Sequence, residues 1–89
     1  MNLIADSFVT EIANACLSHL ASEPDLLAQF LGETGASPDD LRGELDQSLI
    51  LGMFEFFAHN EPAMLAMSAN NSISTEQFMR AYYKLNPGG

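Results

Sequence analysis

The segment DQSLILGMFEFFAH, residues 46–59, constrains the fold of this chain more than any other stretch. Seven of the nine residues from 49 to 57 are apolar, namely Leu49, Ile50, Leu51, Met53, Phe54, Phe56 and Phe57. On a helix, at about 100° per residue, these side chains cover nearly the whole circumference. A helix that is apolar on all sides requires cover on all sides. The sequence therefore predicts that residues 46–59 form the buried central helix of a small bundle.

The segments on either side of this helix show amphipathic spacing and residues that begin or end helices. Ser22, Ser37, Asp46 and Ser74 are candidate N-caps, and Gly35 is a candidate helix end. Prolines close behind several of these positions fit the first turn of a helix. The further helices cover about residues 8–21, 24–34, 37–41, 61–69 and 74–85. The sequence predicts an all-α bundle of six short helices and no strand.

Two parts of the chain resemble each other. Residues 21–28 (ASEPDLLA) align with residues 59–66 (HNEPAMLA) at an offset of 38. We therefore expect one domain of two three-helix units, roughly residues 7–44 and 46–85, with residues 86–89 as a flexible tail. Capping residues that many helices share are the alternative explanation of the match. If the units are real, each has too small an apolar face to be stable alone, so they must pack on each other or on a second chain.

The chain is strongly acidic, with twelve Asp and Glu residues against three Lys and Arg residues and a net charge of −9. Such a charge repels the phosphates of nucleic acids and of anionic membranes, so we expect neither as a partner. Residues 1–45 carry eight of the carboxylates and one arginine. We predict that this half docks a basic protein partner, with candidate contacts Asp25, Glu33, Asp39, Asp40 and Glu44. The alternative is that the acidity only keeps a small, apolar-rich protein soluble.

The basic residues of the second half lie in the last predicted helix. Gln77, Arg80 and Lys84 share one face of this helix, which is the one feature here that is typical of a nucleic-acid contact. Glu76, Arg80 and Lys84 equally form a ladder of charges four residues apart, which stabilises an exposed helix. We favour the ladder.

No group of residues has the spacing of a catalytic, metal or cofactor site. His59 follows Glu55 by four residues, which places both on one helical face, but two such residues do not make a metal site. Cys16 lies on the apolar face of the first helix, and no basic side chain nearby in the sequence would favour a reactive thiolate. We therefore expect a non-enzymatic protein without metal or cofactor.

The location of the protein follows from two further observations. Cys16 is the only cysteine, so no disulfide can form within the chain, which suits a reducing compartment. The sequence has neither a signal peptide pattern nor an apolar run of about 18 residues. We therefore expect a cytoplasmic protein.

The central helix suggests a second function. Because it is apolar on more sides than a thin bundle covers, we expect self-association, with a symmetric homodimer as the simplest form. Met53, Phe54 and Phe57 are the candidate contacts. The same three residues could instead hold a small apolar ligand between the two units, which would make the protein a carrier or sensor rather than an interaction module.

Several motifs occur in a recognisable order along the chain. ASEPDLL at residues 21–27 is followed by Phe30-Leu31, GASPDDLR at 35–42, the apolar helix, Asn60-Glu61-Pro62 and a closing PGG. In this order the chain resembles a family of short acidic bacterial proteins classified only as a domain of unknown function. The resemblance covers essentially the whole chain and is most specific at residues 21–42. It implies an all-helical cytoplasmic bacterial protein and carries over no catalytic or binding residue.

Overall fold

The computed structural model describes residues 7–43 and 45–86. This part of the chain forms six helices and no strand: α1 (Ser7–Ser22), α2 (Pro24–Thr34), α3 (Pro38–Arg42), α4 (Gln47–Ala58), α5 (Glu61–Asn70) and α6 (Thr75–Leu85). The predicted all-α bundle of six short helices is confirmed. Within the described residues, no helix combines the length and the apolar character that a membrane span requires.

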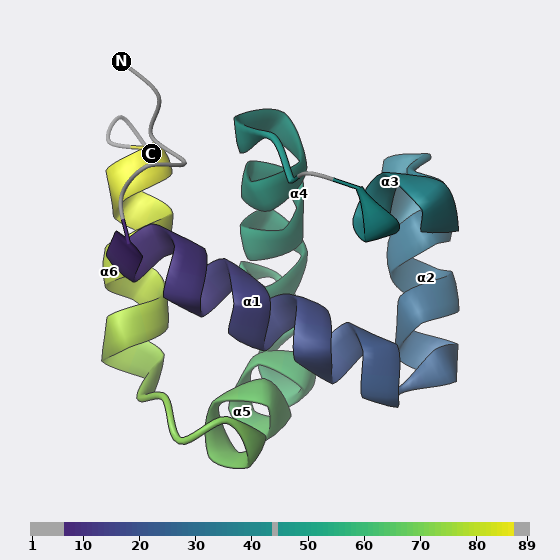
Figure 1. The fold of residues 1–89 in the computed structure, drawn as a ribbon. Helices are drawn as coiled ribbons and strands as arrows, with labels where there is room; N and C mark the ends of the chain where they lie inside the picture. The colour runs from purple at the N-terminus through teal and green to yellow at the C-terminus, as the bar shows by residue number, and fades with distance from the viewer. Residues whose placement is uncertain (1–6, 44, 87–89) are drawn as a thin grey trace.

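α4 stands at the centre of the bundle, with α2 and α6 on opposite sides and α1 across one face (Figure 1). α2, α4 and α6 stand roughly side by side, and α5 lies beneath them at the end where α4 finishes. α1 and α4 pack against each other, and each also packs against α2, α5 and α6. These two helices therefore hold the bundle together.

Phenylalanine rings connect α4 to its neighbours. Phe54 and Phe57 of α4 meet Phe78 of α6 edge to face, with ring centroids 5.6 and 6.4 Å apart. On the other side of α4, Phe56 meets Phe30 of α2 with centroids 5.4 Å apart. All five side chains are buried, and aromatic pairs of this geometry add to the stability gained from burying their area. The predicted central position of this helix is confirmed on these faces.

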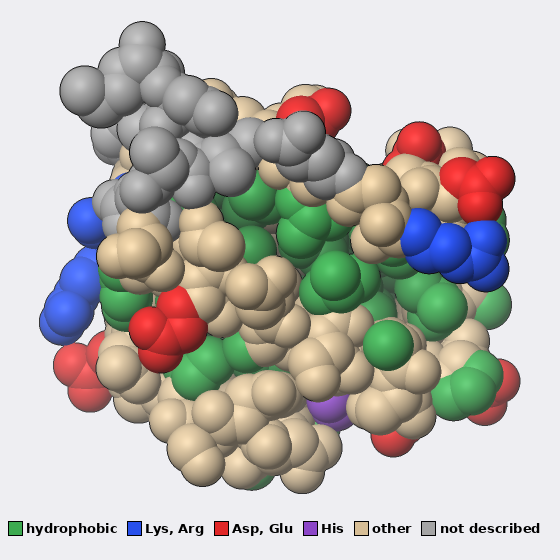
Figure 2. Space-filling view, viewed as in Figure 1, with side chains coloured by type: hydrophobic (Ala, Val, Ile, Leu, Met, Phe, Trp, Pro, Cys, Tyr) green, Lys and Arg blue, Asp and Glu red, His purple; other side chains and the backbone are tan. Residues whose placement is uncertain are grey.

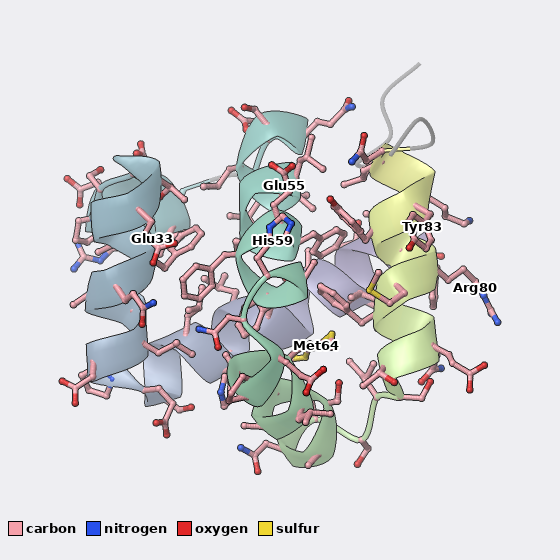
Figure 3. All side chains as sticks on the ribbon, turned by 180° about the vertical axis from the view of Figure 1, so that it is seen from behind. Glu33, Glu55, His59, Met64, Arg80 and Tyr83 are labelled. Atoms are coloured by element: carbon pink, nitrogen blue, oxygen red, sulfur yellow. The ribbon has the colours of Figure 1, made fainter. Side chains whose placement is uncertain are left out.

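One narrow face of α4 remains in contact with solvent. Ser48 and Glu55 are exposed, Gly52 is half-buried, and His59 is exposed directly after the helix. Their spacing of four, three and four residues places them in one stripe. Figure 3 shows Glu55 and His59 on the side of α4 turned away from α1. The expectation that this helix is covered on all sides is wrong along this stripe, because α2 and α6 cover only its flanks.

The predicted helix ends are mostly confirmed. Ser37 and Ser74 each form a capping box with the residue three positions further on. Asp46 Oδ1 accepts a hydrogen bond of 2.8 Å from the N–H of Leu49. Gly35 ends α2 in the left-handed region, at a φ of 75°, which glycine adopts without steric cost. These local hydrogen bonds define where the helices begin and end.

One prediction about a helix start is wrong. Ser22 does not cap α2, because its Oγ donates to the carbonyl of His19 at 2.9 Å, while Glu23 is the N-cap without a side-chain hydrogen bond. The flexible tail at residues 86–89 stays a prediction; its first residue, Asn86, is the C-cap of α6, and its N–H donates to the carbonyl of Tyr82 at 3.0 Å. The rest of that tail, residues 87–89, lies outside the described residues.

The corners before α2 and α5 have nearly the same backbone. Their N-caps Glu23 and Asn60 have φ and ψ of −126° and 87°, and of −133° and 82°. Each N–H donates to the carbonyl three residues earlier at 3.2 Å. The corners lie 37 residues apart, as do the two capping serines, whereas Pro24 and Pro62 lie 38 apart. The third helices of the two halves differ, since α3 has no buried residue and α6 has four. The division into two three-helix units therefore stays a prediction.

Candidate functional site

A groove runs between α2 and the open stripe of α4. It consists of two adjoining hollows of about 420 and 480 Å³ that share Thr34 and Gly52 in their walls. We define this α2–α4 groove by its lining residues, which are Gln29, Phe30, Glu33, Thr34, Ala36, Asp40, Asp46, Ser48, Leu49, Gly52, Glu55, Phe56, His59 and Asn60. Because both long walls are helices, most lining side chains are held on rigid elements.

Gly52 keeps the middle of the groove open. A Cβ placed on Gly52 meets no atom within 4 Å, so there is free space where any other residue would carry its side chain. A glycine inside a helix costs about 1 kcal/mol of stability relative to alanine. Phe30 and Phe56, whose rings meet edge to face, belong to the lining of the groove but are 0% and 7% exposed. Gly52 thus makes α4 less stable and leaves free space between the two walls of the groove.

Four carboxylates line the groove, and none of its lining residues is a lysine or an arginine. Glu33 lies on the α2 wall and Glu55 on the α4 wall (Figure 3), while Asp40 and Asp46 line the hollow toward the start of α4. Glu33 accepts a hydrogen bond from the Gln29 side chain, and the two aspartates accept one each from a backbone N–H. The Glu55 carboxylate accepts none from the described residues. The groove therefore attracts cations.

His59 lies at the end of the groove where α4 finishes. Its backbone N–H donates to the carbonyl of Glu55 at 3.0 Å and caps the helix. Its ring lies one turn away from the Glu55 carboxylate on the same face (Figure 3). No three His, Cys, Asp or Glu side chains within residues 7–43 and 45–86 are arranged to hold a metal ion. His59 is thus a polar lining residue that could exchange hydrogen bonds with a bound group.

The acidic residues predicted to contact a partner do not form one surface. Glu33 and Asp40 line the α2–α4 groove. Asp25 lies in the first turn of α2, in a separate hollow. Asp39 is exposed and forms an ion pair of 2.7 Å with Arg42, which offsets its charge locally. Glu44 lies outside the described residues.

The groove also contains two carboxylates that were not among the predicted contacts. Asp46 and Glu55 belong to the second half of the chain, whereas all the predicted contacts came from the first half. The sequence signal for Glu55 was the series Ser48, Gly52, Glu55 and His59, four positions without an apolar side chain that share one face; Asp46 was marked only as a candidate N-cap.

Met53, Phe54 and Phe57 do not form a face for a second chain or a ligand. All three are 0% exposed, and none lines the α2–α4 groove. Phe78 of α6 packs on Phe54 and Phe57, and His19 of α1 lies with its ring centroid 6.1 Å from that of Phe57. The prediction is wrong for these residues, because side chains of α1 and α6 fill the space around them.

Two other side chains that could carry chemistry are inside the core. Cys16 is 0% exposed, and burial raises the pKa of its thiol because the thiolate would lose its solvation. His19 is 4% exposed, and its Nδ1 has no hydrogen-bond partner in the described part of the chain. Cys16 is enclosed in the core, whereas the edge of His19 lines the hollow that also contains Asp25.

The outer side of α6 carries a second surface, the α6 face, lined by Glu76, Met79, Arg80, Tyr83 and Lys84 around an open hollow of about 560 Å³. Lys84 Nζ lies 5.7 Å from the centroid of the Phe8 ring. Gln77, predicted to share the basic face, instead completes the capping box of α6. In Figure 2 the lysine and arginine side chains gather over α6 at one edge and beside α3 at the other.

Comparison with known proteins places the chain in a family. No curated protein and no solved structure matches it. A family model matches residues 7–88, which include all six helices. The resemblance seen in the order of motifs is thereby confirmed, and it brings no assigned function with it. The chain belongs to the family described as Protein of unknown function (DUF3572).

Proposed function

We propose that this protein is a non-enzymatic protein-interaction module whose α2–α4 groove docks a basic helical segment of a protein partner. One observation carries the proposal: four carboxylates and no lysine or arginine line a groove whose middle Gly52 leaves open. The acidic docking surface expected from the sequence remains part of this proposal. Its location changes from the first half of the chain to the space between α2 and α4.

The dimensions of the groove suit a short helix. Its open stripe on α4 runs from Ser48 to His59, which is about 16 Å at 1.5 Å per residue, or about three helical turns. When a helix docks in a groove, its apolar side chains contact the floor and its polar side chains lie at the rim. Lysine and arginine suit such a rim, because their aliphatic stems pack on apolar surface while their charged ends reach carboxylates.

The charges and the floor contribute differently to binding. An exposed ion pair contributes at most about 1 kcal/mol, so no single carboxylate decides the affinity. Together the carboxylates speed the encounter with a basic partner, and this effect weakens as salt screens charges beyond about 8 Å. Packing of the docked helix into the free space at Gly52 supplies the rest of the affinity, and a side chain at position 52 would block it.

The test uses two glycines in comparable settings. Gly52→Gln fills the middle of the groove. Gly32→Gln is the matched control, because Gly32 is an exposed glycine inside α2 whose Cβ would also meet no atom within 4 Å and which does not line the groove. A displayed library of helical peptides is selected on the wild-type protein, and the binding of the selected peptides to all three proteins is measured by fluorescence polarisation.

We expect the selected peptides to be rich in lysine and arginine and to bind more weakly as salt rises. Gly52→Gln should weaken binding by about tenfold or more, which corresponds to 1.4 kcal/mol, while Gly32→Gln leaves it unchanged. Peptides without basic enrichment, or peptides that bind both glutamine variants equally well, would rule out the groove as the docking site. Capture from a cell lysate with wild-type protein and with Gly52→Gln would then identify the natural partner.

The alternative function, a carrier or sensor of a small apolar ligand, required space beside Met53, Phe54 and Phe57. These side chains have no exposed surface, and residues of α1 and α6 pack against them, so we do not propose it.

A further inference from the structure

We infer that the protein forms a symmetric homodimer in which α6 of each copy lies in the α2–α4 groove of the other. The inference uses the same groove as the proposed function, but it commits to a second copy of this chain as the occupant when no partner is bound. It therefore predicts an association that is measurable with the purified protein alone.

The first support is charge complementarity. The chain has only three lysine and arginine residues, and two of them, Arg80 and Lys84, lie on the α6 face. Arg80 points away from the bundle (Figure 3), and its guanidinium has no hydrogen bond or ion pair with the described residues. Glu55 in the groove likewise has no partner among them. Arg80 of one copy and Glu55 of the other are therefore complementary charges that the single chain leaves uncompensated.

The second support is an exposed aromatic ring. Tyr83 is 50% exposed, and within the described residues only Leu65 is an equally exposed large apolar side chain. Tyr83 lies three residues after Arg80 on the same face of α6. The groove offers free space above Gly52, which suits a flat ring with a polar hydroxyl. Tyrosine and arginine are also the residue types that are enriched at the energetic centres of interfaces.

The arrangement of the two surfaces allows a closed dimer. In Figure 3, Glu33 lies on α2 at the left, Glu55 and His59 lie on the central α4, and Arg80 and Tyr83 lie on α6 at the right. α6 stands beside α4 (Figure 1), and its 11 residues span about 16 Å, the length of the open stripe. A twofold axis between two such faces, parallel to these helices, places each α6 over the groove of the other copy. Closed twofold dimers are the commonest form of homo-oligomer.

The net charge of the chain limits the strength of this dimer. Each copy carries −9, so two copies repel each other at low ionic strength. At physiological salt the screening length is about 8 Å. Salt therefore weakens the repulsion between distant charges of the two copies more than it weakens the contacts made directly at the interface. A basic partner lacks this penalty. We therefore expect a weak dimer that a basic partner displaces from the groove.

The test is the oligomeric state of charge variants, measured by sedimentation velocity at physiological salt. Arg80→Glu should weaken the dimer, while Arg42→Glu is the matched control on the exposed α3. Both variants change the net charge from −9 to −11, since each replaces one positive by one negative charge. The double variant Arg80→Glu with Glu55→Arg reverses the proposed pair. All three positions are exposed, so the variants should fold, which circular dichroism checks.

We expect wild type and Arg42→Glu to dimerise alike, Arg80→Glu to dimerise about tenfold more weakly or worse, and the double variant to recover much of the loss. Three results would overturn the dimer: monomeric wild-type protein up to about 1 mM, equal effects of the two arginine variants, or a double variant weaker than Arg80→Glu. Basic peptides that bind a strictly monomeric protein would leave the proposed function standing. A dimer that binds no basic peptide would support the dimer and rule out the proposed function.

Discussion

Phe30 of α2 and Phe56 of α4 meet edge to face, with ring centroids 5.4 Å apart and ring planes at 76°. Phe30 is the only fully buried residue of α2. This ring contact joins α2 to α4, and both rings also line the α2–α4 groove. The position of one wall of the candidate site therefore depends strongly on Phe30, together with the half-buried leucines of α2 that pack against the core.

Phe30→Ala should lower the free energy of unfolding by about 3–5 kcal/mol, the usual effect of removing a buried aromatic ring. For a domain of this size that is most of the total stability, about 5 kcal/mol. Urea unfolding followed by circular dichroism measures the change. Leu65→Ala, at a half-exposed position, is the control and should change stability by no more than about 0.5 kcal/mol. Similar effects of the two variants would contradict the role of Phe30.

Two glycines should respond in opposite directions to alanine. Gly52→Ala should raise the free energy of unfolding by about 0.5–1 kcal/mol, because α4 is helical there and the added Cβ meets no atom within 4 Å. Gly35→Ala should lower it by more than about 1 kcal/mol, because Gly35 has a φ of 75°. Thermal and urea unfolding of both variants measure the sign. A stabilising Gly35→Ala would mean that α2 ends in another conformation.

Alkaline pH should destabilise the protein through Cys16. Burial raises the pKa of its thiol above the ordinary value of 9.0. As pH rises through this value, the unfolded chain releases the proton while the folded chain keeps it, so stability is fully present below about pH 9 and falls above it. The slope reaches at most about 1.4 kcal/mol per pH unit. Urea unfolding across this range should show a shallower decline for Cys16→Ala, and parallel curves would contradict the prediction.

His19→Leu should raise the free energy of unfolding by about 1 kcal/mol. The imidazole is 4% exposed and its Nδ1 has no hydrogen-bond partner among the described residues, a condition that costs about 1–3 kcal/mol. Leucine has a similar size and carries no polar atom, and it would pack against Phe57. The midpoint of urea unfolding measures the change. A clear loss of stability would show that Nδ1 has a partner in solution.

The helices could be predicted from the sequence because the signals that define them are local. Ser37 and Ser74 bond to residues three positions away, so their capping boxes can be read without knowing the fold. Ser22 shows the limit of this approach. Its hydroxyl could cap the helix that follows or bond the helix that precedes it, and it donates to the carbonyl of His19 in the preceding helix. The central place of α4 also followed from its apolar residues alone.

The groove could not be predicted, because it depends on which side of α4 the other helices leave uncovered. Glu55 was assigned no role, since nothing local distinguishes an exposed glutamate in a groove from one on a convex surface. Asp39 and Asp40 are adjacent in the sequence, yet one pairs with Arg42 and the other lines the groove. Which of the two carboxylates lines the groove depends on how α3 is oriented relative to α2 and α4, and the residues next to each other in the sequence do not determine that.

The contact between α1 and α6 joins the first helix of the bundle to the last. A ribosome synthesises α1 through α5 before Phe78, so during that interval Phe54 and Phe57 have no ring to pack against. The incomplete chain exposes its most apolar helix, a condition that favours aggregation and chaperone binding. Folding of this core therefore waits until α6 has left the ribosome.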